Sequence, residues 1–167
     1  MFDRSLAPHL AAPDGLKADE LAAPGRLIEL SGRGAAARTS TAVGLVRDAQ
    51  LAGESAAWIQ AQGGPLFPPD VAAAGVDLDA LVVAHIPAEG GVAELARAAE
   101  ILLRSGAFGL VVADLSGLRA PRGAAWQARL AALTRRHQSR LVLISDASPR
   151  EGSLGPLIGL RIASRRA

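Results

Sequence analysis

The chain has 167 residues, half of them apolar, which is enough for one domain with a substantial core and excludes intrinsic disorder. It has no cysteine, which excludes disulfides and thiolate chemistry, and its three histidines lack metal-ligand spacing. Residues 1–100 carry seven basic and thirteen acidic side chains (net −6), whereas residues 101–167 carry eleven and three (net +8). This asymmetry indicates either that residues 101–167 bind an anionic partner or that their arginines lie on exposed, solvated helix faces.

The first 24 residues are rich in Pro, Ala and Asp, and they predict an irregular arm with a short helix around residues 16–21. Charged residues near the start, Asp3 and Arg4 among them, interrupt any signal-peptide core. No apolar run approaches the roughly 18 residues that a membrane span needs. We therefore expect a cytoplasmic protein with no membrane contact, whose folded domain covers residues 25–167.

After the arm, strands are predicted to alternate with helices. Such alternation implies a parallel sheet covered on both faces, with ligands bound beyond the carboxyl ends of the strands. The expected strands are residues 26–31, 55–60, 81–85, 108–113, 141–145 and 157–164, and the expected helices are residues 39–51, 91–105 and 124–137, with a helical turn at 71–74.

The segment between the first strand and the first helix has the length of a phosphate-binding loop, G-x-x-x-x-G-K-[ST]. Gly32 opens the motif, Gly34 lies inside it and Thr39 closes it. Ala37 stands at the second glycine and adds a Cβ where phosphates need close backbone approach. Arg38 replaces the lysine and lacks its compact ammonium charge. The motif predicts a degenerate, vestigial phosphate site.

The same residues also allow an interpretation without any ligand. Thr39 could only cap the helix, the glycines could only form a turn, and Arg38 could point to solvent. We favour a vestigial anion pocket, because the N-terminus of a helix attracts anions whatever its side chains. Hydrolysis is not expected, since several parts of the phosphoryl-transfer machinery are missing together.

Five segments, in order, resemble the ATPase core of the RecA recombinase family. The resemblance implies an α/β, RecA-like P-loop NTPase core, with a mostly parallel central sheet flanked by helices on both faces. The matching segments are residues 24–30 (PGRLIEL), 57–62 (AWIQAQ), 75–81 (GVDLDAL), 103–107 (LRSGA) and 157–166.

Departures from the family pattern carry the functional inference. Gln62 stands where the family has a glutamate that activates water, and a neutral amide cannot take the proton. The family's Walker B aspartate aligns with Ala113 of this chain. Asp114 follows one residue later, so it can take the role of that aspartate only if the end of the strand shifts. The two loops that bind DNA in the family are shortened here, at residues 117–123 and 146–156. We therefore expect no catalytic residue, no metal and no bound ATP.

The sequence is most similar to RecA-related proteins of the ImuA type, from mutagenesis cassettes that are induced by DNA damage. This resemblance implies a nucleoid-associated accessory protein of translesion synthesis that binds RecA, a Y-family polymerase homologue, or both, and inhibits RecA filaments. The candidate contact residues are Leu16 and Leu21 in the arm and Arg129, Arg135 and Arg136 on a basic helix that also includes Arg140.

Three alternatives stay open. The first is a weak ATPase that uses Arg38 and Asp114. The second is a binder of single-stranded nucleic acid through the arginines of residues 119–140, for which Trp126 is the candidate stacking residue, although its spacing favours a core or interface position. The third is a cell-division inhibitor of the SulA type, which also has a degenerate RecA-like core.

Overall fold

The computed structural model describes residues 23–32, 36–120, 125–148 and 150–163. Its strands are β1 (Arg26–Ser31), β2 (Ala56–Ala61), β3 (Leu81–Ile86), β4 (Leu110–Asp114), β5 (Arg140–Ser145) and β6 (Leu160–Ala163). Its helices are α2 (Ala36–Leu51), α3 (Pro68–Ala73), α4 (Gly91–Ser105) and α5 (Ala125–His137), and η1 (Ala88–Gly90) is a short 3-10 helix.

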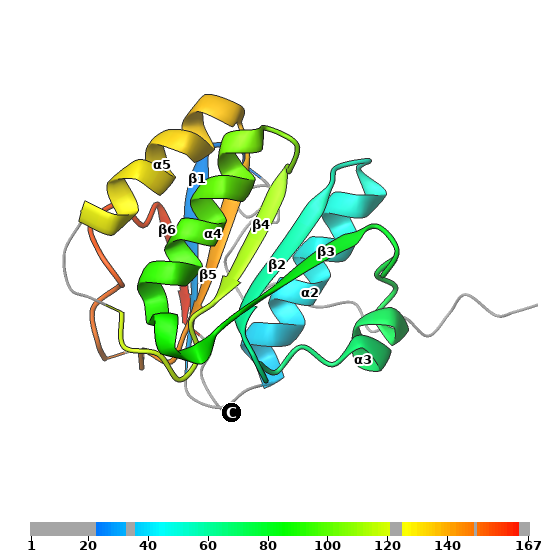
Figure 1. Ribbon diagram of the computed structural model, residues 1–167, viewed down its shortest axis with the longest axis horizontal. Helices are drawn as coiled ribbons and strands as arrows, with labels where there is room; N and C mark the ends of the chain where they lie inside the picture. Colours follow the sequence, from blue (N-terminus) through cyan, green and yellow to red (C-terminus); the bar gives the residue numbers. More distant parts are fainter. Residues whose placement is uncertain (1–22, 33–35, 121–124, 149, 164–167) are drawn as a thin grey trace, which may run out of the picture.

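All six strands join one sheet, in the order β3-β2-β4-β5-β1-β6, and every pairing is parallel. In Figure 1, α4 and α5 lie on the viewer's side of the sheet, and α2 lies behind it. The predicted α/β class, a parallel sheet between two helical layers, is confirmed.

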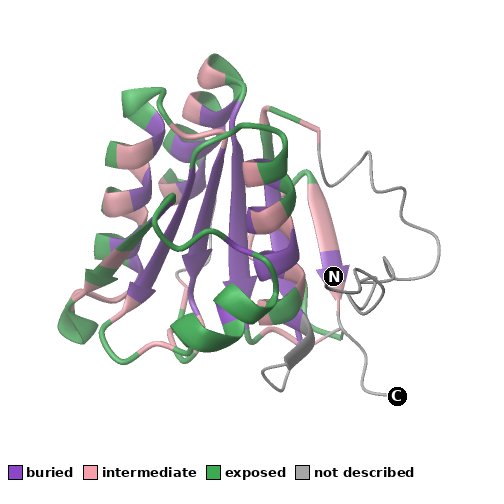
Figure 2. Cartoon of the chain, turned by 90° about the vertical axis from the view of Figure 1, so that its right-hand side faces the viewer, coloured by how far each residue is buried: buried purple, intermediate pink, exposed green. Residues whose placement is uncertain are grey.

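The central strands are mostly apolar because both of their faces are covered. Every residue of β4 and β5 is buried, and these strands form part of the purple centre of Figure 2. Side chains alternate between the two faces. Ile28 and Leu30 pack with α2, whereas Leu27 packs with α4 and α5. The sheet therefore separates two hydrophobic clusters.

Helix α4 shows how its sequence fixes its position. Val92, Leu95 and Ala99 are buried against the sheet. At the end of the helix Leu103 is buried, whereas Leu102 is only half-buried. The helix ends at Gly106, whose φ of 69° is a left-handed conformation that glycine adopts without strain.

Several predicted boundaries differ from the structure. Helix α2 begins at Ala36, three residues before the predicted start. Helix α3 begins at Pro68, three residues before the predicted helical turn, because a proline is compatible with the first turn of a helix. Strand β6 begins only at Leu160, since Gly155 and Ile158 form a turn before it. Residues 1–22 of the predicted arm lie outside the described residues.

Candidate functional site

The predicted phosphate loop starts at the carboxyl edge of the sheet, between β1 and α2. The Gly32 N–H donates to the carbonyl of Ser145 at 3.3 Å, so the loop begins against the end of β5. Gly34 lies outside the described residues. Thr39 is half-buried and is the fourth residue of α2, so the interpretation of Thr39 as the helix cap is wrong.

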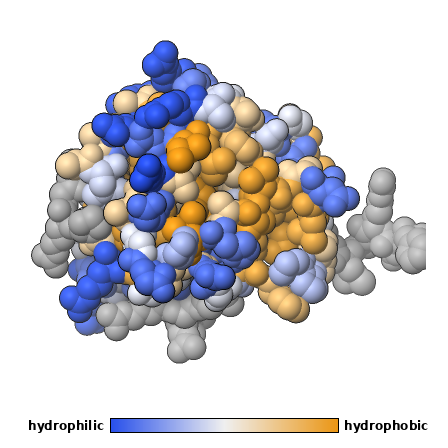
Figure 3. Space-filling view, in the orientation of Figure 1, coloured by the Kyte–Doolittle hydropathy of each residue, from blue (hydrophilic) through white to orange (hydrophobic). Residues whose placement is uncertain are grey.

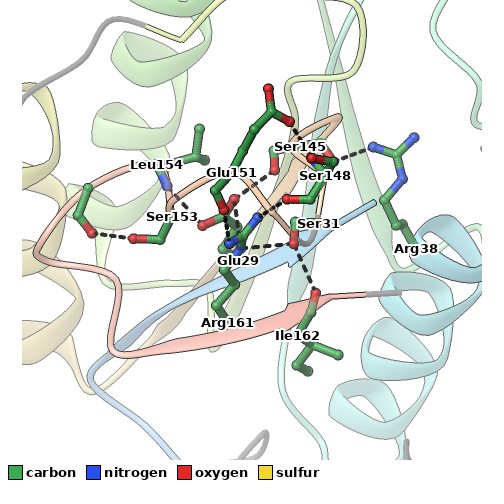
Figure 4. Close-up of polar contacts among 11 residues, drawn as sticks. Glu29, Ser31, Arg38, Ser145, Ser148, Glu151, Ser153, Leu154, Arg161 and Ile162 are labelled. Carbon is green, nitrogen blue, oxygen red and sulfur yellow. Dashed lines mark hydrogen bonds and ion pairs between the residues drawn. The ribbon is translucent and has the colours of Figure 1, made fainter. Parts of the chain in front are cut away.

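Arg38, at the position of the loop lysine, is turned inward. Its Nη1 donates to Asp146 Oδ1 at 2.7 Å and also to the carbonyl oxygen of Ser145. The side chain of Arg38 is 6% exposed and that of Asp146 is 48% exposed. Figure 4 shows the guanidinium directed at the end of β5. The interpretation that Arg38 points to solvent is therefore wrong.

Asp114 is the last residue of β4 and is buried. Leu110 and Val112 pack with α2, and Ala113 belongs to the opposite cluster. Alternation therefore places Asp114 on the α2 face. Its Oδ1 accepts from the N–H of Ser116 at 2.9 Å, and its buried Oδ2 has no hydrogen-bond partner among the described residues.

Gln62 follows β2 directly and is exposed. Its backbone N–H donates to the carbonyl of Ile86 at 2.8 Å, which extends the pairing of β2 with β3 by one bond. Strand β4 lies between β2 and β5 in the sheet, so Gln62 and Arg38 are not neighbours along this edge.

These residues can be compared with the needs of a bound triphosphate and its metal. Asp114 fits a metal-facing role, because one buried oxygen lacks a partner among the described residues. Arg38 does not fit the role of the lysine, because a carboxylate of its own chain already engages it. Within the described ranges, no group of three His, Cys, Asp or Glu side chains could hold a metal ion. Of the described residues, Asp114 therefore fits this ligand, and Arg38 in this conformation does not.

A second polar cluster, which the sequence did not predict, surrounds Glu29 in the middle of β1. Glu29 is fully buried, and its Oε1 accepts from Ser145 Oγ at 2.8 Å. Its Oε2 accepts from the N–H of Leu154 at 3.0 Å, and Arg161 Nε lies 3.7 Å from Oε1. Figure 4 shows these groups converging from β1, β5 and β6. The sequence feature that could have indicated this cluster is an acidic residue, Glu29, within a largely apolar strand.

Arg161 fastens the loop after β5 to the sheet. Its Nη1 donates to the carbonyl of Glu151 at 2.6 Å, and its Nη2 donates to the carbonyl of Ser148 at 2.9 Å. Its Nε donates to Ser31 Oγ at 3.0 Å. The described residues of this loop are therefore held by β1 and β6.

A cavity of about 790 Å³ lies between the loop after β4 and the loop after β5. Beside it, Gln127 of α5 is fully buried, and neither of its amide atoms has a partner among the described residues. A Cβ on Gly155 would lie 2.5 Å from Gln127 Oε1, so an alanine there would require the end of the Gln127 side chain to shift. The lining includes Leu115, Leu118, Arg119, Ala120, Ala147, Ser153 and Leu154.

Three of the predicted partner residues, Arg129, Arg135 and Arg136, lie on α5. Arg129 is exposed and lies 3.3 Å from Glu100 of α4, whereas Arg135 and Arg136 are exposed in the last turn of α5. Arg140 does not belong to this helix. It begins β5, is buried and pairs with Glu54. Trp126 is half-buried against the α4 and α5 cluster, in keeping with a core position, and Leu16 and Leu21 lie outside the described residues.

Strand β3, at the edge of the sheet, offers an apolar surface that the sequence did not single out. Val82 is 46% exposed and Val83 is 36% exposed, on opposite faces of the strand. Ala84 and Ile86 share the face of Val82 and are half-buried. Figure 3 shows a continuous hydrophobic area over β2 and β3, beside α4. We call Val82, Val83, Ala84 and Ile86 the β3 edge.

The fold and these positions define a RecA-like α/β core. The family model described as the RecA N-terminal domain matches residues 20–147. The chain therefore belongs to the RecA N-terminal domain family. No helix in the described ranges has the length and apolar character needed to cross a membrane.

RecA proteins are among its relatives. The chain is 38% identical over 98 residues to Protein RecA of Saccharopolyspora erythraea and 39% identical over 98 residues to that of Mycobacterium marinum. Each match covers 59% of this chain and 27% of the relative, so the chain spans about a quarter of these RecA proteins.

A solved structure of SulA from Pseudomonas aeruginosa has a similar fold. The TM-score is 0.54 and the sequence identity is 19%, and the match covers 72% of this chain and 98% of SulA.

Proposed function

We propose that this protein is a non-catalytic accessory member of the RecA family that acts in DNA-damage-induced mutagenesis. It binds RecA, a Y-family polymerase homologue, or both, and it inhibits RecA filament activity near the nucleoid. The observation that carries the proposal is the engagement of Arg38 by Asp146 and Ser145. A side chain held in this way is not available to a γ-phosphate. Gln62, at the position of the water-activating acid, supports the same conclusion.

Binding to a partner is supported by the β3 edge. A strand at the edge of a sheet presents unpaired backbone groups to other chains, and natural proteins normally protect such edges with charged side chains or a covering segment. In the described part of the chain, β3 pairs only with β2 and exposes two valines. A RecA-family subunit that offers such an edge but cannot hydrolyse ATP would join the end of a filament and stop its growth.

A pull-down with purified RecA tests this proposal, and a second pull-down uses the polymerase homologue. The wild-type chain should retain RecA and should inhibit strand exchange without consuming ATP. Val82→Glu should lower RecA retention at least about tenfold, because burying an unpaired charge is costly. Ile101→Glu, at an apolar residue of α4 that is 61% exposed, is the matched control and should bind normally.

The same experiment compares a second surface. If Arg135→Ala combined with Arg136→Ala abolishes RecA binding while Val82→Glu does not, the contact lies on α5 and the β3 edge is not the interface. Unaltered strand exchange at excess wild-type protein would contradict the inhibitory function itself.

A weak ATPase is the second candidate, and it is favoured by the Oδ2 of Asp114, which has no partner among the described residues. Phosphate release at saturating ATP, measured with and without single-stranded DNA, separates the two functions. Turnover that disappears in Arg38→Ala would establish the ATPase. DNA binding that falls steeply with salt would support the nucleic-acid alternative.

The SulA-type alternative is supported by the shared fold alone. It predicts that expression of the chain in a bacterium blocks division and produces filamentous cells. The accessory function predicts normal cell length at the same level of expression.

A further inference from the structure

The Arg38 guanidinium is a buried cation that requires an anion. Moving a charged group out of water is costly unless an opposite charge and hydrogen bonds compensate. Asp146 supplies that charge at 2.7 Å, and the carbonyl of Ser145 supplies a second acceptor. Arg38 Nε is also buried, and no described residue accepts from it. Asp146 therefore neutralises the cation, but the described residues do not use all of its donors.

Asp146 uses both of its carboxylate oxygens. Oδ1 accepts from Arg38, and Oδ2 accepts from the backbone N–H of Gly117 at 2.6 Å. A guanidinium and a backbone N–H are the donors that proteins present to phosphate oxygens. The carboxylate thus occupies a set of donors suited to an oxyanion, and it links the first turn of α2 to the loop after β4.

The two members of the pair differ in their freedom to move. Arg38 is 6% exposed, whereas Asp146 is 48% exposed at the start of the loop after β5. A half-exposed carboxylate can turn into water at a much lower cost than a buried guanidinium. If the pair opens, it is therefore Asp146 that leaves.

We propose that Asp146 is a built-in substitute for a phosphate group, which closes an anion site at Arg38 and Gly117. A polyphosphate anion competes with Asp146 for these donors and binds only when the carboxylate is removed. When Asp146 leaves, the loop after β4 loses its anchor at Gly117. This inference rests on the non-catalytic site of the proposed function, and it explains how the chain itself keeps that site closed.

Titration with inorganic pyrophosphate, followed by calorimetry, tests the proposal. Asp146→Ala should bind pyrophosphate at least about tenfold more tightly than the wild type, and adding Arg38→Ala should abolish the gain. Asp146→Asn keeps the shape of the side chain and removes the charge, so it should gain affinity even if the alanine variant is unstable. Asp48→Ala, which removes an exposed aspartate paired with Arg47, should change nothing.

Hydrogen exchange gives a second measurement on the same variants. The Gly117 amide should exchange faster in Asp146→Ala than in the wild type, because it has lost its acceptor. Wild-type affinity for pyrophosphate equal to that of a folded Asp146→Asn variant would overturn the proposal, as would the absence of binding by that variant. The RecA pull-down on the wild-type chain is a separate measurement, so its failure and this one are distinguishable.

Discussion

Glu29 is the residue on which three segments of the chain converge. Its carboxylate accepts from β5 and from the loop after β5, and it lies beside Arg161 of β6. A buried carboxylate of this kind does not add much net stability over an apolar residue. Its role is to fix the position of the groups around it, since it accepts from Ser145 Oγ and the Leu154 N–H and places a negative charge beside Arg161.

Replacing Glu29 with alanine should destabilise the chain by about 3–5 kcal/mol, because it leaves the Arg161 charge without its carboxylate. Urea denaturation measures the change in the free energy of unfolding, and an unchanged slope confirms that the folded state is preserved. Glu94→Ala removes an exposed acid that lies 4.0 Å from Arg97, and it should cost less than about 0.5 kcal/mol. Equal losses in the two variants would contradict this account of Glu29.

At the scale of single residues the sequence predicted positions better than contacts. Gly32, Arg38 and Thr39 were found because a linear motif places them. The contact between Arg38 and Asp146 was not found, because the two residues are 108 positions apart and no local pattern joins them. The pairing of Glu29 with Arg161 was missed for the same reason, because these two residues are also far apart in the sequence.

Among the elements, α4 shows why burial rather than helix propensity determines stability. One side of α4 packs on β2 and β4, and the other side faces solvent. Leu95 is fully buried, whereas Ile101 on the same helix is largely exposed. The two residues differ little in volume, so the environment separates their contributions.

Leu95→Ala should destabilise the chain by about 2–5 kcal/mol, since it removes buried methyl groups and leaves a cavity. Ile101→Ala should stay within about 0.5 kcal/mol of the wild type. Thermal and urea unfolding of both variants gives the comparison. A large loss at Ile101 would mean that another chain covers the exposed side of α4 in solution.

The order and type of the elements could be predicted, because apolar runs and glycines mark them strongly. Residues 141–144 of β5 form an uninterrupted apolar stretch, and Gly106 marks the end of α4. Boundaries were less accurate wherever tertiary contacts decide them, as at the start of α2. Arg140 was assigned to a basic helix although it begins β5, because its partner Glu54 is distant in the sequence.

For the molecule as a whole, the sheet has a protected centre and an open side. Strands β4 and β5 lie between other strands and are wholly buried, whereas β3 is the outermost strand and is largely exposed. Local opening should therefore be easier at β3 than at β5.

Hydrogen exchange followed by mass spectrometry should show this difference directly. The amides of β5 should exchange only through global unfolding, and those of β3 should exchange at least about tenfold faster. Saturating RecA should slow exchange in β3 and leave β5 unchanged. Protection of β3 in the free chain equal to that of β5 would show that the edge is already covered in solution.

The pairing of β1 with β6 also has a kinetic consequence. Ser31 and Ile162 are hydrogen-bonded across 131 positions, and the contacts of Arg161 with β1 span a similar distance. Native contacts between such distant residues slow folding, because the chain loses much freedom before they form. During synthesis, Glu29 leaves the ribosome long before Arg161 does. A nascent chain would hold this carboxylate without its cation until the last strand emerges, which makes that period the most vulnerable to aggregation or to binding by a chaperone.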